Sequence, residues 1–104
     1  ILISDMSGII MDYICLDRPI IFIDPDEGLD AWNECSIPAS YRAGEIVKTP
    51  EELVTAIKSS LDSPNKFQSM RQDIISKVFS SIDGNSSVRA ADEILSFAKR
   101  KGLY

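Results

Sequence analysis

The sequence contains no histidine, so the most common general base near neutral pH and the most common metal ligand are both absent. No Ser-His-Asp or Cys-His catalytic arrangement can be built from it. Asp5, Asp12, Asp24 and Asp26 remain as candidate bases or magnesium ligands, but carboxylates of this kind are usually solvated. We therefore expect no catalytic residue and no metal site in this chain.

Cysteine and basic residues are also scarce. Cys15 and Cys35 form no CxxC or zinc-type spacing, which favours reduced thiols in a cytosolic protein. Eleven basic against sixteen acidic residues give a net charge of −5, so nucleic acid is not an expected partner. The run Lys99-Arg100-Lys101 is typical of the end of a helix, where cations complement the helix dipole. No signal peptide and no apolar run of about 18 residues appears, so no transmembrane segment is expected.

What is present fits one folded domain. The 104 residues are 44% hydrophobic and 26% charged, which is ordinary for a globular protein. The chain opens with Ile1-Leu2-Ile3, a pattern typical of a buried strand. We interpret residues 1–104 as a fragment of one larger domain, with the rest of its sheet upstream. An exposed sheet edge would then promote self-association.

The first third of the chain predicts a βαβ unit. A strand at 1–3 leads into a polar turn at 4–8 and an apolar helix at 9–16. Arg18-Pro19 ends that helix, and the apolar run 20–23 predicts a strand buried on both faces. Strands joined in this way run parallel with a right-handed crossover.

The rest of the chain predicts a long loop at 24–45, a brief strand at 46–48 and three helices. Thr49-Pro50 with Glu52 is a strong helix start, Ser63-Pro64 repeats the start signal, and Ser86 or Ser87 is expected to cap the last helix. The predicted apolar stripes of the three helices are Leu53, Ile57 and Leu61 with Val54; Phe67, Met70, Ile74, Val78 and Ile82 with Ile75 and Phe79; and Val88, Ala91, Leu95 and Ala98. The fold class is α/β with a helical C-terminal tail.

Two turns are candidate anion sites. Ser7 and Gly8 lie where a strand meets a helix, so a hydroxyl, helix N–H groups and an unhindered backbone are available to a phosphate. The alternative is that Ser4, Asp5 and Ser7 only cap the helix.

The second turn is Asp83-Gly84-Asn85-Ser86-Ser87-Val88-Arg89. Its arginine can fork onto phosphate oxygens while the serine hydroxyls donate. The alternative is a plain turn between helices in which Arg89 pairs with Asp92 or Glu93.

Taken in order, four segments of the chain resemble the CDP-glycerol glycerophosphotransferase family of teichoic-acid polymerases and primases. The first is similar to that family's threonine-aspartate-tyrosine-serine-serine segment and the last to its aspartate-glycine-x-alanine-serine-x-arginine segment. The four segments are Ile3 to Tyr13, Asp17 to Phe22, Gly44 to Leu53 and Asp83 to Arg89. Ser4, Met6 and Gly8 depart from the first motif, so one hydroxyl donor is absent.

The resemblance implies a partial Rossmann-like domain of a GT-B type enzyme. Such enzymes transfer glycerol phosphate from CDP-glycerol to a lipid-linked acceptor, act at the cytoplasmic face of the membrane as peripheral proteins, and hold no tightly bound cofactor. The donor-binding residues implied are Ser7, Gly8, Asp83, Gly84, Ser86, Ser87 and Arg89. The family's catalytic histidines fall upstream, so this chain alone is expected to be inactive.

Two alternatives stay open at this level. The turn from Asp5 to Gly8 also resembles a nucleotide-sugar glycosyltransferase or a UDP-N-acetylglucosamine 2-epimerase-like enzyme. The other alternative is a non-catalytic interaction module whose strand edges pair with another chain.

Overall fold

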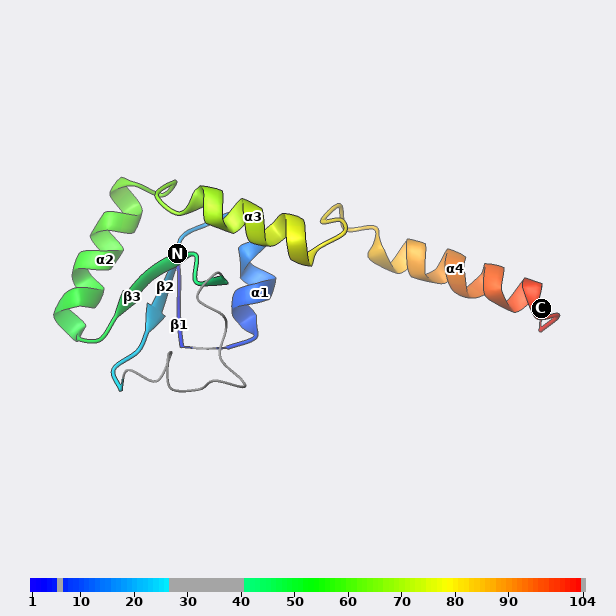
Figure 1. The fold of residues 1–104 in the computed structure, drawn as a ribbon, viewed down its shortest axis with the longest axis horizontal. Coiled ribbons are helices and arrows are strands. Elements are labelled where there is room, and N and C mark those ends of the chain that lie inside the picture. The colour runs from blue at the N-terminus through cyan, green and yellow to red at the C-terminus, as the bar shows by residue number, and fades with distance from the viewer. Residues whose placement is uncertain (6, 27–40, 104) are drawn as a thin grey trace.

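The computed structural model describes residues 1–5, 7–26 and 41–103. In chain order its elements are β1 (Leu2–Ser4), α1 (Ile9–Ile14), β2 (Ile20–Ile23), β3 (Gly44–Val47), α2 (Pro50–Asp62), α3 (Gln68–Val78) and α4 (Ser86–Arg100). The strands form one parallel sheet in the order β1-β2-β3 (Figure 1). The α/β class, the βαβ unit and the helical tail are therefore confirmed. Most of the loop predicted at 24–45 lies outside the described residues.

The sheet has a hydrophobic cluster on each face. Ile20 and Phe22 of β2 point to one face, where Ile10 and Ile14 of α1 and Ile74 of α3 complete the core. Ile21 points to the other face and packs with Val47 and with residues of α2. Because side chains alternate along a strand, the continuous apolar run of β2 supplies both clusters, as expected for a strand covered on both sides.

Close strand packing explains the residue at the start of β3. Gly44 pairs with Ile20 in the parallel register, and a Cβ at position 44 would collide with the backbone carbonyl of Ile20. Only glycine lets the two backbones approach in this way. The strand predicted at 46–48 is therefore real, but it begins two residues earlier.

Helix α2 begins as predicted. The backbone N–H of Glu52 donates to the Thr49 hydroxyl at 3.2 Å, and Pro50 occupies the first turn. The predicted apolar stripe is wrong at Val54 and Leu61, which are exposed, and Ala56 and Ser60 are buried instead. The side of α2 that faces the sheet therefore includes these two small side chains, which let the helix approach the sheet closely.

Helix α3 is shorter than predicted. Residues 64–67 form a turn, and the helix begins at Gln68. The predicted stripe is wrong at three positions, because Met70, Val78 and Ile82 are exposed. The largest fully buried side chain of α3 is a charged one, Arg71. Ion pairing to the α1–β2 turn, described below, accounts for that burial.

Helix α4 projects away from the sheet and its covering helices (Figure 1). None of its residues is buried, and Asn85 rather than a serine precedes it, with no side-chain cap. The predicted stripe Val88, Ala91, Leu95 and Ala98 lies on one side of the helix, but the described residues do not bury it. The radius of gyration is 18.3 Å, against about 13 Å expected for a compact chain of this length.

Candidate nucleotide-binding site

The first predicted turn lies where it was expected, between the carboxyl end of β1 and the start of α1. The carbonyls of Ser7 and Gly8 accept the first helical bonds from Ile10 and Met11, both at 3.1 Å. The N–H of Ile9 makes only a long contact of 3.5 Å to the Ser7 hydroxyl, and Gly8 has no side-chain cap. A Cβ on Gly8 would meet none of the described residues within 4 Å, so they leave this backbone open to an approaching group.

The N-terminus of α2 lies at the same edge of the sheet but is chemically different. Its capping donors are already used, because Glu52 accepts the Lys48 N–H at 2.7 Å and the Glu52 N–H donates to Thr49. Glu51 and Glu52 also place two carboxylates in this first turn. Their charge opposes a phosphate, and since the first turn of α1 carries one carboxylate, Asp12, the start of α1 is the less acidic of the two.

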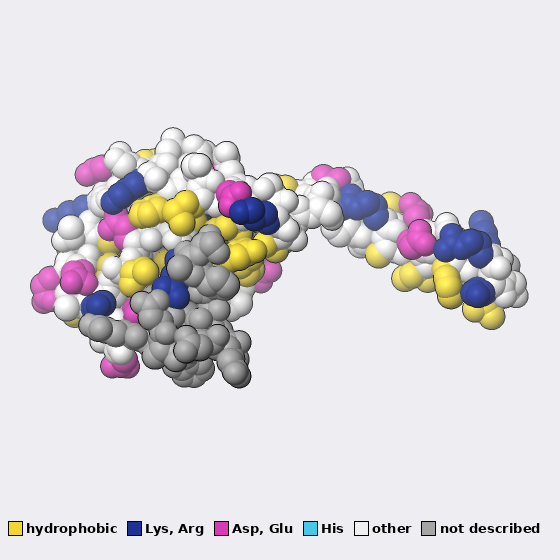
Figure 2. Space-filling model, viewed as in Figure 1, with side chains coloured by type: hydrophobic (Ala, Val, Ile, Leu, Met, Phe, Trp, Pro, Cys, Tyr) yellow, Lys and Arg dark blue, Asp and Glu magenta, His cyan; other side chains and the backbone are white. Residues whose placement is uncertain are grey.

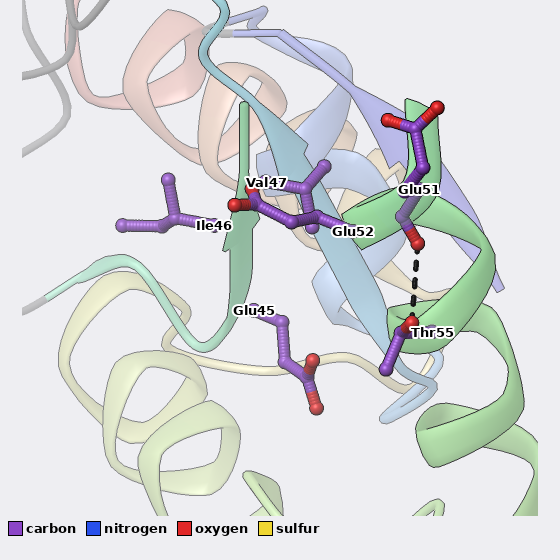
Figure 3. Close-up of a pocket in the computed structure, with 6 residues that line it drawn as sticks. All are labelled: Glu45, Ile46, Val47, Glu51, Glu52 and Thr55. Carbon is purple, nitrogen blue, oxygen red and sulfur yellow. Dashed lines mark hydrogen bonds between the residues drawn. The ribbon is translucent and has the colours of Figure 1, made fainter. Parts of the chain in front are cut away.

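A hollow of about 350 Å³ in the described part of the chain also fits a phosphate poorly. It lies between β3 and α2, and Figure 3 shows three carboxylates around it, those of Glu45, Glu51 and Glu52. Glu45 accepts hydrogen bonds from Lys66 at 2.8 Å and Ser59 at 2.7 Å, which lower its pKa. This network stabilises the contact of β3 with α2.

The second predicted turn is a compact hydrogen-bonded unit. Arg89 donates Nη1–H to both carboxylate oxygens of Asp83 at 3.0 Å, and its Nη2–H to the Ser86 hydroxyl at 3.2 Å. The N–H of Asn85 also donates to Asp83, and the two partners lower the Asp83 pKa. The suggested pairing of Arg89 with Asp92 or Glu93 is therefore wrong. The guanidinium is oriented by the turn that precedes its helix.

Gly84 makes this turn possible. Its φ of +76° falls in the left-handed region that residues with a side chain rarely adopt. Ser87 is exposed in the first turn of α4. The turn therefore presents a hydroxyl, an arginine and helix N–H groups on the same short segment, together with the Asp83 carboxylate.

The two turns do not meet in this structure. The turn between α3 and α4 lies beyond the far end of α3, whereas the turn between β1 and α1 lies at the carboxyl edge of the sheet (Figure 1). The structure therefore brings the second group of residues together and keeps it apart from the first. A donor-binding role for either turn remains a prediction.

Sequence reasoning missed the polar network around Arg71. Its Nε–H donates to Asp17 at 2.7 Å, and its Nη2–H to the carbonyls of Asp17 and Pro64. Gln68 and Gln72 also donate to Asp17. The available signal was an arginine within an apolar stripe, three residues before the buried Ile74.

The described residues contain no cluster of three or more His, Cys, Asp or Glu side chains able to hold a metal ion. Nor does any helix in the described part of the chain combine the length and apolar character needed to cross a membrane.

A parallel α/β sheet with a glycine turn after its first strand is an architecture typical of nucleotide-binding transferases. Residues 1–96 match the model of the family described as CDP-Glycerol:Poly(glycerophosphate) glycerophosphotransferase. The match covers nearly the whole chain, so the protein belongs to this family, which confirms the resemblance and implies a transferase that uses a nucleotide-activated donor. Searches of curated proteins and of solved structures gave no significant match.

Proposed function

We propose that this chain is the donor-binding part of an enzyme that transfers glycerol phosphate from CDP-glycerol to a lipid-linked acceptor. The product would be a teichoic-acid-like cell-wall polymer, made at the cytoplasmic face of the membrane by a peripheral enzyme of GT-B type. The observation that carries the proposal is the family match over residues 1–96, because it includes both candidate turns. The chain is proposed to be the C-terminal part of the nucleotide-binding domain and inactive by itself.

The reaction needs charge stabilisation more than covalent help from the protein. An acceptor hydroxyl oxygen bonds to the phosphorus that carries the glycerol, the bond from that phosphorus to the bridging oxygen breaks, and CMP leaves. Because this chain has no histidine, the acceptor proton is assigned to a base in another part of the enzyme. The role left to residues 1–104 is to bind and orient the donor.

The open backbone at Ser7 and Gly8 supports a role in binding the donor diphosphate. Helix N–H groups at the carboxyl edge of a parallel sheet attract phosphates, and the first turn of α1 carries one carboxylate, Asp12, against two in the first turn of α2. The missing hydroxyl relative to the family motif leaves fewer donors, so backbone N–H groups carry most of this contact.

The second turn is proposed to bind the same group or the transferred phosphate through Arg89 and Ser87. Asp83, Gly84 and Ser86 shape the turn and orient the guanidinium. Arginine suits this role because its planar fork matches phosphate oxygens. Since the turns lie apart here, each is assigned its own contribution, to be tested separately.

Calorimetric titration of CDP-glycerol into single-residue variants tests these assignments. We expect Arg89→Gln to weaken binding about tenfold or more, because a charge-assisted hydrogen bond is lost. The matched control is Lys66→Gln, which removes a cation paired with Glu45. Equal affinity for the donor in Arg89→Gln and wild type would remove the second turn from the site.

A further inference from the structure

Arg89 is paired with an anion in this structure, and that anion belongs to the chain itself. Its Nη1–H groups donate to both carboxylate oxygens of Asp83 at 3.0 Å. Figure 2 shows acidic and basic side chains side by side on the surface where α4 begins. The ligand proposed for Arg89 is a phosphate, which is also an anion. The carboxylate and the ligand therefore need the same cation.

The Asp83 carboxylate is charged, and donors other than Arg89 also hold it in place. The backbone N–H of Asn85 donates to it at 3.0 Å and, with the bond from Arg89, lowers the pKa of Asp83. A hydrogen bond from the Ser81 side chain adds to this effect. The carboxylate is therefore ionised at neutral pH, and it stays beside Arg89 when the guanidinium turns toward another anion.

The ion pair is weak enough to open. The side chains of Arg89 and Asp83 are 47% and 49% exposed, and exposed ion pairs contribute little because water and salt screen them. The other Arg89 contact, from Nη2–H to the Ser86 hydroxyl at 3.2 Å, is made to a neutral group. A phosphate that reaches the surface at this turn can therefore exchange places with the carboxylate.

We propose that Asp83 is an internal competitor for Arg89, which occupies the guanidinium when no phosphate is bound and lowers its affinity for phosphate. This inference rests on the proposed function, because it takes a phosphate as the ligand of Arg89. A phosphate that replaces the carboxylate loses the energy of one ion pair. A phosphate that shares the guanidinium with the carboxylate meets a like charge beside it. In both cases Asp83 opposes phosphate binding.

Such a competitor would help the enzyme to release a bound phosphate. When the phosphate leaves, Asp83 pairs with Arg89 again, so the guanidinium is not left without an anion. The energy of the restored pair offsets part of the phosphate contact that is lost. An enzyme that extends a polymer would repeat this release at every transfer.

The acidic residues of α4 itself do not have this role. Asp92 and Glu93 follow Arg89 within about one helical turn, but in the described part of the chain Arg89 bonds to neither. Glu93 accepts a bond from Arg100 at 3.1 Å instead. Asp92 thus carries the same charge as Asp83 on the same short segment without pairing with Arg89, which makes it the matched control.

Calorimetric titration of the chain with CDP-glycerol and, separately, with inorganic phosphate tests the proposal. Asp83→Ser removes the carboxylate but keeps a side-chain oxygen that can accept the Asn85 N–H. We expect both ligands to bind about threefold more tightly to Asp83→Ser than to wild type, because an exposed ion pair no longer competes. Asp92→Ser should change either affinity much less. Circular dichroism checks that the helix content is unchanged.

The same substitutions in a chain that carries Arg89→Gln show whether Asp83 acts through Arg89. The cation for which carboxylate and phosphate compete is then absent. We expect Asp83→Ser to change the affinity for CDP-glycerol in that chain no more than Asp92→Ser does.

Two results would overturn the proposal. They are an affinity that is unchanged or weaker in Asp83→Ser, and a gain in affinity that persists when Arg89 is replaced by glutamine. If Arg89→Gln by itself weakens donor binding and either result is found, the second turn still binds phosphate and only the competition is wrong. If Arg89→Gln leaves donor binding unchanged, the proposed role of the turn fails, and this inference fails with it.

Discussion

Arg71 donates its Nε–H to Oδ1 of Asp17 at 2.7 Å, although only 1% of the Arg71 side chain is exposed. Asp17 adopts a left-handed φ of 49° directly after α1, in the turn that leads to β2. The ion pair therefore ties this strained turn to α3, across more than fifty residues of sequence. It is the main polar connection between the βαβ unit and the helices that follow.

Removing the Asp17 carboxylate should strongly destabilise the fold. We expect Asp17→Ala to destabilise the fold by about 3–5 kcal/mol, because a buried guanidinium loses its partner. Arg71 already has one buried nitrogen, Nη1, without a hydrogen-bond partner among the described residues. Arg71→Met should cost less than Asp17→Ala, since it removes the buried charge itself. Urea unfolding of both variants measures the difference, and the opposite order would contradict this account.

The same carboxylate makes stability depend on pH. Burial alone raises the Asp17 pKa, but bonds from Gln68, Arg71 and Gln72 outweigh it and hold the pKa below the usual 3.8. The unfolded state then binds the proton more readily, so the contribution is fully present above the unfolded pKa. It is lost as pH falls toward the lower folded pKa. We expect Asp17→Asn to reduce the loss of stability between about pH 5 and pH 2, and an unchanged acid profile would contradict this.

Gly44 should tolerate no side chain. A Cβ there meets the backbone carbonyl of Ile20, which cannot move without breaking the pairing of β2 with β3. We expect Gly44→Ala to destabilise the fold by about 1–3 kcal/mol or more. Gly8→Ala is the control, since its Cβ enters open space. Thermal unfolding compares them, and equal effects would mean that the two strands pack less closely.

The cap of α2 should contribute measurably to stability. Thr49→Ala removes the hydroxyl that accepts the Glu52 N–H, and we expect a loss of about 1 kcal/mol. Asn85→Ala is the matched control, because Asn85 precedes α4 without a side-chain cap and should change the stability little. Chemical denaturation of the two variants checks this, and a similar loss for both would contradict the assigned cap.

Local sequence patterns predicted which residues form strands and helices better than they predicted which side chains are buried. The apolar run at 20–23 and the start at Thr49-Pro50 are set by the strand itself and by local capping, and both were correct. Leu61 and Val88 have helical spacing, but spacing alone does not say whether a surface covers that side of the helix, and both are exposed. The burial of Arg71 depends on Asp17, a partner distant in sequence.

In the candidate site, too, local turn structure was predicted and the contacts between side chains were not. The glycine turns were recognised because left-handed or open backbone has a local signature, as at Gly84. The bond from Arg89 back to Asp83 was missed in favour of partners one helical turn ahead. The arrangement of the two turns in space follows from the direction of α3, which no local pattern encodes.

The central claim is that this chain binds a cytidine-activated polyol phosphate, and amide chemical shifts of the labelled chain during a CDP-glycerol titration test it most directly. CDP, UDP-N-acetylglucosamine and inorganic phosphate serve as comparators. The account predicts shifts at Ser7–Gly8 and at Ser86–Arg89 that are larger for the cytidine ligands than for the others. A preference for the UDP sugar, or no shift at either turn in a folded sample, would contradict it.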